Sequence, residues 1–191
     1  MAKHIIGTRV FSLVAVIVTL GAAPAGADVS IGLSDAAGVE VFGNYLTLAF
    51  SILSPRVELR AGAMEASVGW RAITSPSPVP GTGGWRLDAE IAVAPAFGTY
   101  TPAIGLGYLY VRLAPAERYP DPDASTLYFV LAPLRFGFPF APGVQFLVSA
   151  LELRYGPLFP VDAPLNENQG AFHLDACIVR LGVRIPLSRD G

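Results

Sequence analysis

Apolar and polar residues alternate along several stretches of the chain. The pattern is clearest in three segments: 57–61, 85–93 and 177–187. In the second of these, Arg86, Asp88 and Glu90 occupy the even positions and apolar residues the odd ones. A period of two residues is that of a β-strand, whose successive side chains point to opposite faces. These segments are therefore predicted to be strands with one apolar and one charged face.

The alternation slips by one residue after Ala63. Apolar residues are odd-numbered before this point and even-numbered after it, at Met64, Ala66, Val68 and Trp70. One extra residue in a strand produces such a slip. We therefore predict a single strand over 56–73 with a β-bulge near Ala63.

Glycine and proline divide the sequence from residue 28 onward into eight predicted strands. The predicted strands are 28–34, 42–54, 56–73, 84–97, 102–114, 125–138, 143–156 and 170–187. The links between them are moderate at 35–41, long at 74–83, 115–124 and 157–169, and short at 54–56, 98–101 and 139–142. With the amino terminus in the periplasm, every short link falls on the periplasmic side, as in transmembrane barrels. The sequence therefore predicts an all-β fold, an eight-stranded antiparallel up-and-down transmembrane β-barrel.

A helical membrane protein is disfavoured by the longest uncharged run after the amino terminus, 91–111. Two prolines and three glycines interrupt it, which indicates strand, turn and strand. Aromatic residues also suit a barrel, because they fall near the predicted strand ends and would form two belts. The outer belt is predicted from Trp70, Trp85, Tyr110, Tyr128, Tyr155 and Phe172, and the inner belt from Phe50, Phe97, Tyr100, Phe136, Phe138 and Phe140.

The first 27 residues have the layout of a secretory signal peptide. Lys3 and Arg9 are basic, 10–20 is almost entirely apolar, and Ala25-Gly26-Ala27 fits the cleavage pattern. The apolar run is shorter than the roughly 20 residues of a membrane-spanning helix. We therefore predict cleavage before Asp28, export, and one barrel domain over 28–191.

Charge and cysteine content exclude several functions. Residues 28–191 hold eleven arginines, no lysine and fifteen acidic residues, a net charge of −4. This balance argues against nucleic-acid binding, which needs a clustered basic surface. Cys177 is the one cysteine, so no disulfide can form within the chain. Cys177 is in phase with the apolar Val179 and Leu181, which predicts a lipid-facing position. The sequence predicts no cofactor and no metal site, because no other cysteine or histidine lies at ligand spacing.

The charged faces of the predicted strands would point into the barrel. The predicted inward residues are Glu58, Arg60, Glu65, Arg71, Arg86, Asp88, Glu90, Glu152, Arg154, Arg180 and Arg184. The interior of an eight-stranded barrel is just wide enough for side chains to fill. We therefore expect these residues to pair across the lumen and close it.

The last predicted strand ends in the octapeptide Arg180-Leu181-Gly182-Val183-Arg184-Ile185-Pro186-Leu187. It resembles the carboxy-terminal pattern of small OmpA-like outer-membrane barrels, with Arg180, Gly182, Ile185 and Leu187 at the positions of that signal. The resemblance implies a Gram-negative outer-membrane protein that contacts lipid and lipopolysaccharide and is assembled by the barrel-assembly machinery. The sequence departs from the pattern because Leu187 replaces an aromatic residue and four residues follow it.

A second resemblance, to barrels that modify lipid A, implies a histidine with a serine and an acid near the outer rim. His173 and Asp175 are the candidates, with Ser125 or Thr126 as a nucleophile. The His-x-Ser pattern of a deacylase is absent, because Asp175 stands in the serine position.

The favoured interpretation is a non-enzymatic barrel with an envelope-structural, adhesion or ligand-contact role through its outer loops. A lipid A-modifying enzyme using His173 is the first alternative. A soluble exported barrel that binds a small apolar ligand is the second, because both faces of 127–134 are apolar.

Overall fold

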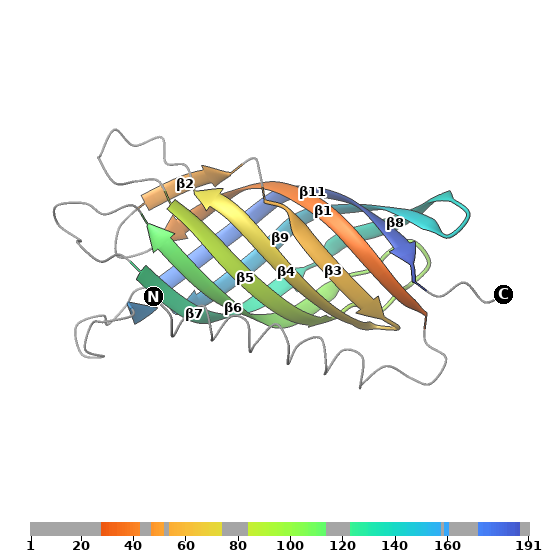
Figure 1. Ribbon diagram of the computed structural model, residues 1–191, viewed down its shortest axis with the longest axis horizontal. Coiled ribbons are helices and arrows are strands. Elements are labelled where there is room, and N and C mark those ends of the chain that lie inside the picture. Colours follow the sequence, from red (N-terminus) through yellow and green to blue (C-terminus); the bar gives the residue numbers. More distant parts are fainter. Residues whose placement is uncertain are drawn as a thin grey trace.

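In the computed structural model the chain forms a single closed barrel of strands (Figure 1). The structure describes residues 28–42, 47–51, 54–73, 84–113, 123–157, 159–160 and 172–187. The predicted signal peptide lies outside these residues. Within them, no helix is long and apolar enough to cross a membrane.

Eleven antiparallel segments make up the eight strands of the barrel. They are β1 (Val29–Phe42), β2 (Thr47–Ser51), β3 (Arg56–Ala61), β4 (Met64–Ile73), β5 (Gly84–Val93), β6 (Ala103–Leu113), β7 (Asp123–Ala132), β8 (Leu134–Ala141), β9 (Val144–Pro157), β10 (Phe159–Pro160) and β11 (Phe172–Pro186). β2 and β3 both pair with β1 and form the second barrel strand, and β7 and β8 both pair with β9 and form the sixth. β10 continues the line of β9 along β7. Pairing of β1 with β11 completes the ring.

The predicted number of strands is confirmed, but the first boundaries were wrong. β1 runs through the predicted link 35–41, and the predicted turn 54–56 is an interruption between β2 and β3. The predicted bulge at Ala63 is a two-residue hairpin turn, with Ala61 opposite Met64. Gly62 has φ +59°, as the first position of a type II′ turn requires. A two-residue turn joins an odd to an even position, so it gives the same slip in alternation as a bulge.

The two ends of the barrel differ in their connections. At one end, which we call the short-turn end, lie the 62–63 turn, the 94–102 connection, the 142–143 turn and both ends of the described barrel. The 94–102 connection adds to the edge of β8, where Thr101 N donates to Arg135 O at 2.8 Å and Gly137 N donates to Thr99 O at 2.7 Å. At the opposite end the connections run through residues outside the described part. The predicted short links 98–101 and 139–142 lie at the short-turn end, whereas the predicted short link 54–56 lies within a barrel strand and the tight turn is at 62–63 instead.

In three neighbouring barrel strands, the residues that face the lumen switch between even and odd numbers partway along the strand. The three switches lie side by side. The inward residues are even-numbered up to Ala132 and odd-numbered from Arg135 in β7 and β8. The same exchange takes place around Leu151 in β9, where φ is +58°, and around Ile178 in β11. Residues 133–134, 150–151 and 178–179 lie beside one another in the ladders. Paired strands present the same face, so the exchanges in these three strands match one another. β1 keeps one phase, and its pairing with β11 absorbs the exchange by a register shift between Ala37 and Gly38.

The outer face of the barrel is apolar and its interior is charged. Leu33, Ile104, Leu127, Phe129 and Ile178 are each at least 60% exposed. Asp28 is the single charged residue that is exposed among the side chains the structure describes. This distribution is the reverse of that in a soluble protein, whose charged residues are mostly on the surface.

The predicted aromatic belts hold in part. Trp70 and Tyr155 point outward on the barrel wall, and Phe97, Tyr100 and Phe138 point outward near the short-turn end. Tyr128 instead lies in the lumen and Tyr110 is buried. Phe50 is in β2, in the half of the barrel away from the short-turn end.

Candidate functional site

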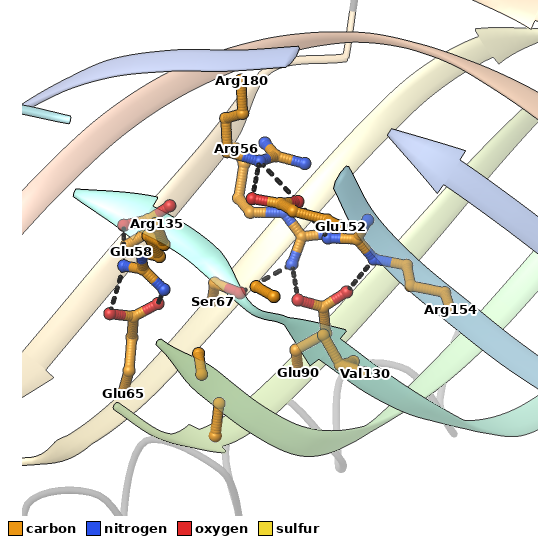
Figure 2. A pocket seen from close by; sticks show the side chains of 13 residues that line it. Arg56, Glu58, Glu65, Ser67, Glu90, Val130, Arg135, Glu152, Arg154 and Arg180 are labelled. Carbon is orange, nitrogen blue, oxygen red and sulfur yellow. Dashed lines mark hydrogen bonds and ion pairs between the residues drawn. The ribbon is translucent and has the colours of Figure 1, made fainter. Parts of the chain in front are cut away.

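The lumen holds a network of ion pairs and hydrogen bonds, part of which is shown in Figure 2. Its buried charged members are Arg56, Glu58, Glu65, Arg71, Arg86, Asp88, Glu90, Arg135, Glu152, Arg154, Asp175, Arg180 and Arg184. They come from every barrel strand except those formed by β1 and β6, as far as these are described. β1 joins through Ser34, whose hydroxyl donates to Glu58 at 3.2 Å and accepts from Arg180 at 3.3 Å. The inward face of β6 is formed by glycine and apolar residues.

Asp175 lies at the end of the network farthest from the short-turn end. Its carboxylate binds Arg71 at 2.8 Å, Arg86 at 2.7 Å and Arg154 at 3.5 Å. Arg71 also donates from Nε to the hydroxyl of Ser54 at 3.1 Å. Arginine is suited to this arrangement because its five N–H groups can serve several acceptors at once.

Asp88 and Glu90 form the centre of the network. Arg56 binds both carboxylates, and Arg154 binds Glu90 at 2.5 Å. The hydroxyl of Tyr128 donates to Glu90 at 2.8 Å. Every one of these groups is buried, so each carboxylate keeps its charge through partners rather than through water.

Two glycines make space for this centre. A Cβ at Gly69 would lie 3.0 Å from Arg56 Nη2 and 3.1 Å from Asp88 Oδ1. A Cβ at Gly107 would overlap the ring of Tyr128, which lies against the β6 backbone. Close approach of a bulky group to a strand is a common reason for glycine there.

Two further groups continue the network toward the short-turn end. Glu152 binds Arg154 at 3.0 Å and Arg180 at 2.9 Å. Closer to the short-turn end, Glu65 binds Arg135 at 2.6 Å and Arg184 at 2.9 Å. Glu58 binds the same two arginines, at 3.4 Å and 3.1 Å respectively. Each of these three acids therefore contacts two arginines.

Little space remains between these side chains. The cavity in Figure 2 has a volume of about 20 Å³, with Ala92, Ala103, Val130 and Ala132 on its apolar side. That is enough for about one water molecule. A wider vestibule of about 500 Å³ opens at the short-turn end, and Arg184 is at its inner limit. The layer formed by Glu58, Glu65, Arg135 and Arg184 separates the two spaces.

Comparison with solved structures identifies a protein with the same architecture. The barrel is similar to Neisserial surface protein A. The two share 13% sequence identity at a TM-score of 0.50, over 82% of this chain and 96% of that one. Neisserial surface protein A is an outer-membrane barrel, and at this identity the likeness shows the fold alone. No protein-family model matches the chain, and no curated protein matches it in sequence.

The structure places ten of the eleven predicted inward charges in the buried network. Arg60 lies instead at the short-turn end, half-buried, where it donates to Gly62 O and Ala94 O at 2.8 Å each. Arg56, Arg135 and Asp175 were missed. Arg56 was assigned to a turn, and the other two lie beyond points where the strand phase changes. The charge of each residue was the available signal. An arginine or aspartate in an apolar membrane-spanning strand needs a polar partner, which favours a position facing the lumen.

The predicted lipid-facing position of Cys177 was wrong. The irregularity at Ile178 turns Cys177 into the lumen opposite Glu152, and its side chain is fully buried. His173 and Asp175 are also fully buried inside the barrel.

The candidate nucleophiles on β7 do not complete a catalytic arrangement with Asp175. The hydroxyl of Thr126 donates to the main-chain carbonyls of Leu127 and Pro157. Ser125 lies one residue earlier, on the opposite face of the strand. Asp175 is held by three arginines, so its carboxylate serves the ion-pair network. The described residues contain no group of three or more His, Cys, Asp or Glu side chains able to hold a metal ion.

Proposed function

We propose that the chain is an integral outer-membrane β-barrel with a closed lumen and a non-enzymatic role in the cell envelope. The observation that carries this proposal is the reversed distribution of side chains. Two dozen large apolar side chains are exposed, while thirteen charged side chains are buried in the lumen. A surface of this extent is far larger than the few hundred Å² of apolar patch found on soluble monomers, and lipid is the solvent that suits it.

The connections support the orientation of the barrel. Both ends of the described barrel lie with the shorter turns, as do the termini and short turns of outer-membrane barrels on the periplasmic side. The long connections would then face outward, where adhesion or ligand contact would take place. Lipid and lipopolysaccharide would surround the wall, and the Arg180 to Leu187 segment of β11 would be read by the barrel-assembly machinery.

The lumen supports a structural role rather than a pore. Thirteen charged side chains fill it, and the cavity between them holds about one water molecule. Removing either partner of a buried ion pair is strongly destabilising, so the pairs tie the barrel strands together.

Fractionation and gel mobility test the proposal. The full chain is expressed in a Gram-negative host, and the outer-membrane fraction is run on SDS gels with and without boiling. We expect a heat-modifiable band in the outer-membrane fraction. A band in the soluble periplasm would refute the proposal and favour the soluble exported barrel.

A matched pair of variants tests what the outer face contacts. Leu106→Arg puts a charge on the outward face of β6, and Ala63→Arg puts one on an exposed turn. In lipid the first change costs up to about 2–4 kcal/mol and the second close to nothing. If both variants give the same amount of folded barrel, the outer face meets water.

A further inference from the structure

The vestibule at the short-turn end is large enough to hold a ligand. Its volume of about 500 Å³ lies within the range of small-molecule pockets, which is roughly 300–1,000 Å³. The β8–β9 hairpin forms one of its walls and reaches farther than the turn between β3 and β4 (Figure 1). More than half of the lining residues are glycine, alanine, proline or valine. An organic group of modest size would therefore meet a mostly apolar wall.

Arg60 brings to the vestibule a positive charge that no acid balances. Its guanidinium donates from Nε to Gly62 O and from Nη2 to Ala94 O. These carbonyls are neutral, so they accept hydrogen bonds without compensating the charge. Among the residues that the structure describes, no carboxylate lies within ion-pair distance of Arg60. Nη1 remains for a further acceptor.

Arg184 lines the same vestibule from the other side of β1. β1 pairs with β3 and with β11, which places Arg60 opposite Ser30 and Arg184 opposite Gly32. Ser30 and Gly32 are successive inward positions of β1. Gly32 has no side chain to stand between the two arginines. The two side chains therefore border one space, one inward position apart.

Two buried polar groups at the vestibule lack a partner in the described part of the chain. Arg184 binds Glu58 and Glu65 through Nη2, and its buried Nε has no acceptor. The hydroxyl of Thr101 is also buried without a hydrogen bond. Both residues are more than nine-tenths buried, and both line the vestibule. Buried polar groups without a partner are rare, and a bound ligand would supply one.

The charges around the vestibule favour an anion. The layer that separates it from the inner cavity holds two acids and two arginines, and each acid contacts both arginines. That layer is balanced by itself, so Arg60 adds one uncompensated positive charge. Asp28 is the one acid among the described lining residues, and it is exposed. Water and salt therefore screen the charge of Asp28 more than that of the half-buried arginine.

We propose that the vestibule binds a small organic oxyanion, a carboxylate or a phosphate monoester, with its anionic group between Arg60 and Arg184. Arginine suits this role because its planar guanidinium donates paired N–H bonds to carboxylate and phosphate oxygens. The rest of the ligand lies along the small apolar residues of the wall. The ligand enters from the periplasm, and this last point alone rests on the proposed function.

Calorimetric titration tests the inference. The full chain is folded into dodecyl maltoside micelles, whose headgroup carries neither phosphate nor carboxylate. Butyl phosphate, butyrate, inorganic phosphate and butanol are titrated separately at low ionic strength, and the heat in protein-free micelles is subtracted. We expect at least one of the two organic anions to bind saturably at about millimolar concentration or below. Inorganic phosphate should bind more weakly, and butanol should not bind.

Each probe has an outcome that decides the inference. The tighter of butyl phosphate and butyrate identifies the anionic group that the site prefers. No saturable binding of either one up to about 10 mM would overturn the inference, and so would butanol that binds as tightly. Inorganic phosphate that binds as tightly as butyl phosphate would overturn the organic part of the ligand.

Arg60 variants test where the anion binds. Arg60→Gln should weaken binding at least about tenfold, because one charge-assisted contact is lost, and Arg60→Lys should weaken it less. Arg112→Gln removes the same charge from β6 near the opposite end of the barrel and is the matched control. Equal affinities of Arg60→Gln and the unmodified barrel, or equal weakening by Arg112→Gln, would place the anion elsewhere.

Ser30 variants keep the test decisive if Arg60→Gln fails to fold. Ser30→Glu places a carboxylate opposite Arg60 in the ladder, where it competes with the ligand. Ser30→Gln has nearly the same size and no charge. Binding should be lost in the first variant and kept in the second, and equal affinities in the two would overturn the inference.

Failure of this inference and failure of the proposed function have different readouts. Binding is measured in micelles, whereas the location of the barrel is measured by fractionation. A barrel that fractionates with the outer membrane and binds none of the anions refutes the inference alone. A barrel that binds them and fractionates with the soluble periplasm refutes the proposed function and leaves the site in place.

Discussion

Glu152 provides the sharpest test of the ion-pair network. It is the one carboxylate that the described residues bring within ion-pair distance of Arg180, at 2.9 Å. Glu152→Gln keeps the volume and one acceptor oxygen but leaves Arg180 charged and buried. Breaking a buried pair in this way costs about 3–5 kcal/mol. Arg154 keeps Glu90 and Asp175, and the neighbouring cavity of about 20 Å³ can admit one water molecule, so we expect a loss near the lower limit.

Urea unfolding from lipid vesicles, followed by tryptophan fluorescence, measures this loss. Arg180→Met combined with Glu152→Gln removes both charges, and the double variant should be more stable than the sum of the single losses predicts. The difference is the interaction energy of the pair. A loss below about 0.5 kcal/mol for Glu152→Gln, or simple additivity in the double variant, would show that the pair contributes no stability of its own and would refute the reasoning.

Four other outcomes are expected. The folded barrel should give no steady single-channel current in planar bilayers, because its lumen is filled; stable openings would contradict the closed network. Gly107→Val should lower the free energy of unfolding by about 1–3 kcal/mol, because the added methyl groups overlap the Tyr128 ring, and an unchanged unfolding curve would rule out that contact. Asp35→Leu should cost about 1–3 kcal/mol and Asp35→Asn less, because Asp35 Oδ1 accepts from Ser54 N at 2.6 Å, where the barrel strand is interrupted; equal losses would count against this role. Cys177 should react with a maleimide only after boiling, whereas rapid labelling of the folded barrel would put the thiol on its surface.

The sequence predicted the fold because regular alternation continues through most barrel strands. Arg86, Asp88 and Glu90 were assigned to the lumen correctly, since each lies two residues from the next on an unbroken strand. Prediction from alternation fails where a strand changes phase. At Pro133 the backbone has no N–H to donate, and beyond it the inward positions become odd, which brings Arg135 inside.

Other features depend on pairing between distant segments. Leu151 and Ile178 have no local sequence signal that marks an irregularity, and their effect follows from lying opposite each other. The Ala63 slip had two local explanations, a bulge or a turn, and the alternation alone did not separate them. Which arginine meets which acid also depends on side chains that are far apart in sequence, such as Arg71 and Asp175.

The change of phase also shapes how this barrel can vary in evolution. In β9 the lumen-facing Ser149 and Glu152 are separated by two residues instead of one, so deleting Leu151 would restore regular alternation and leave Glu152 and Arg154 inside. Ile178 would then be an extra residue on β11, a β-bulge like the one that β11 already forms against β1 between Ala37 and Gly38. A residue inserted into a regular stretch of β9 would instead turn the side chains beyond it to the other face. Loss of Leu151 or Ile178 should therefore be tolerated among descendants of this sequence more readily than insertions elsewhere in these strands.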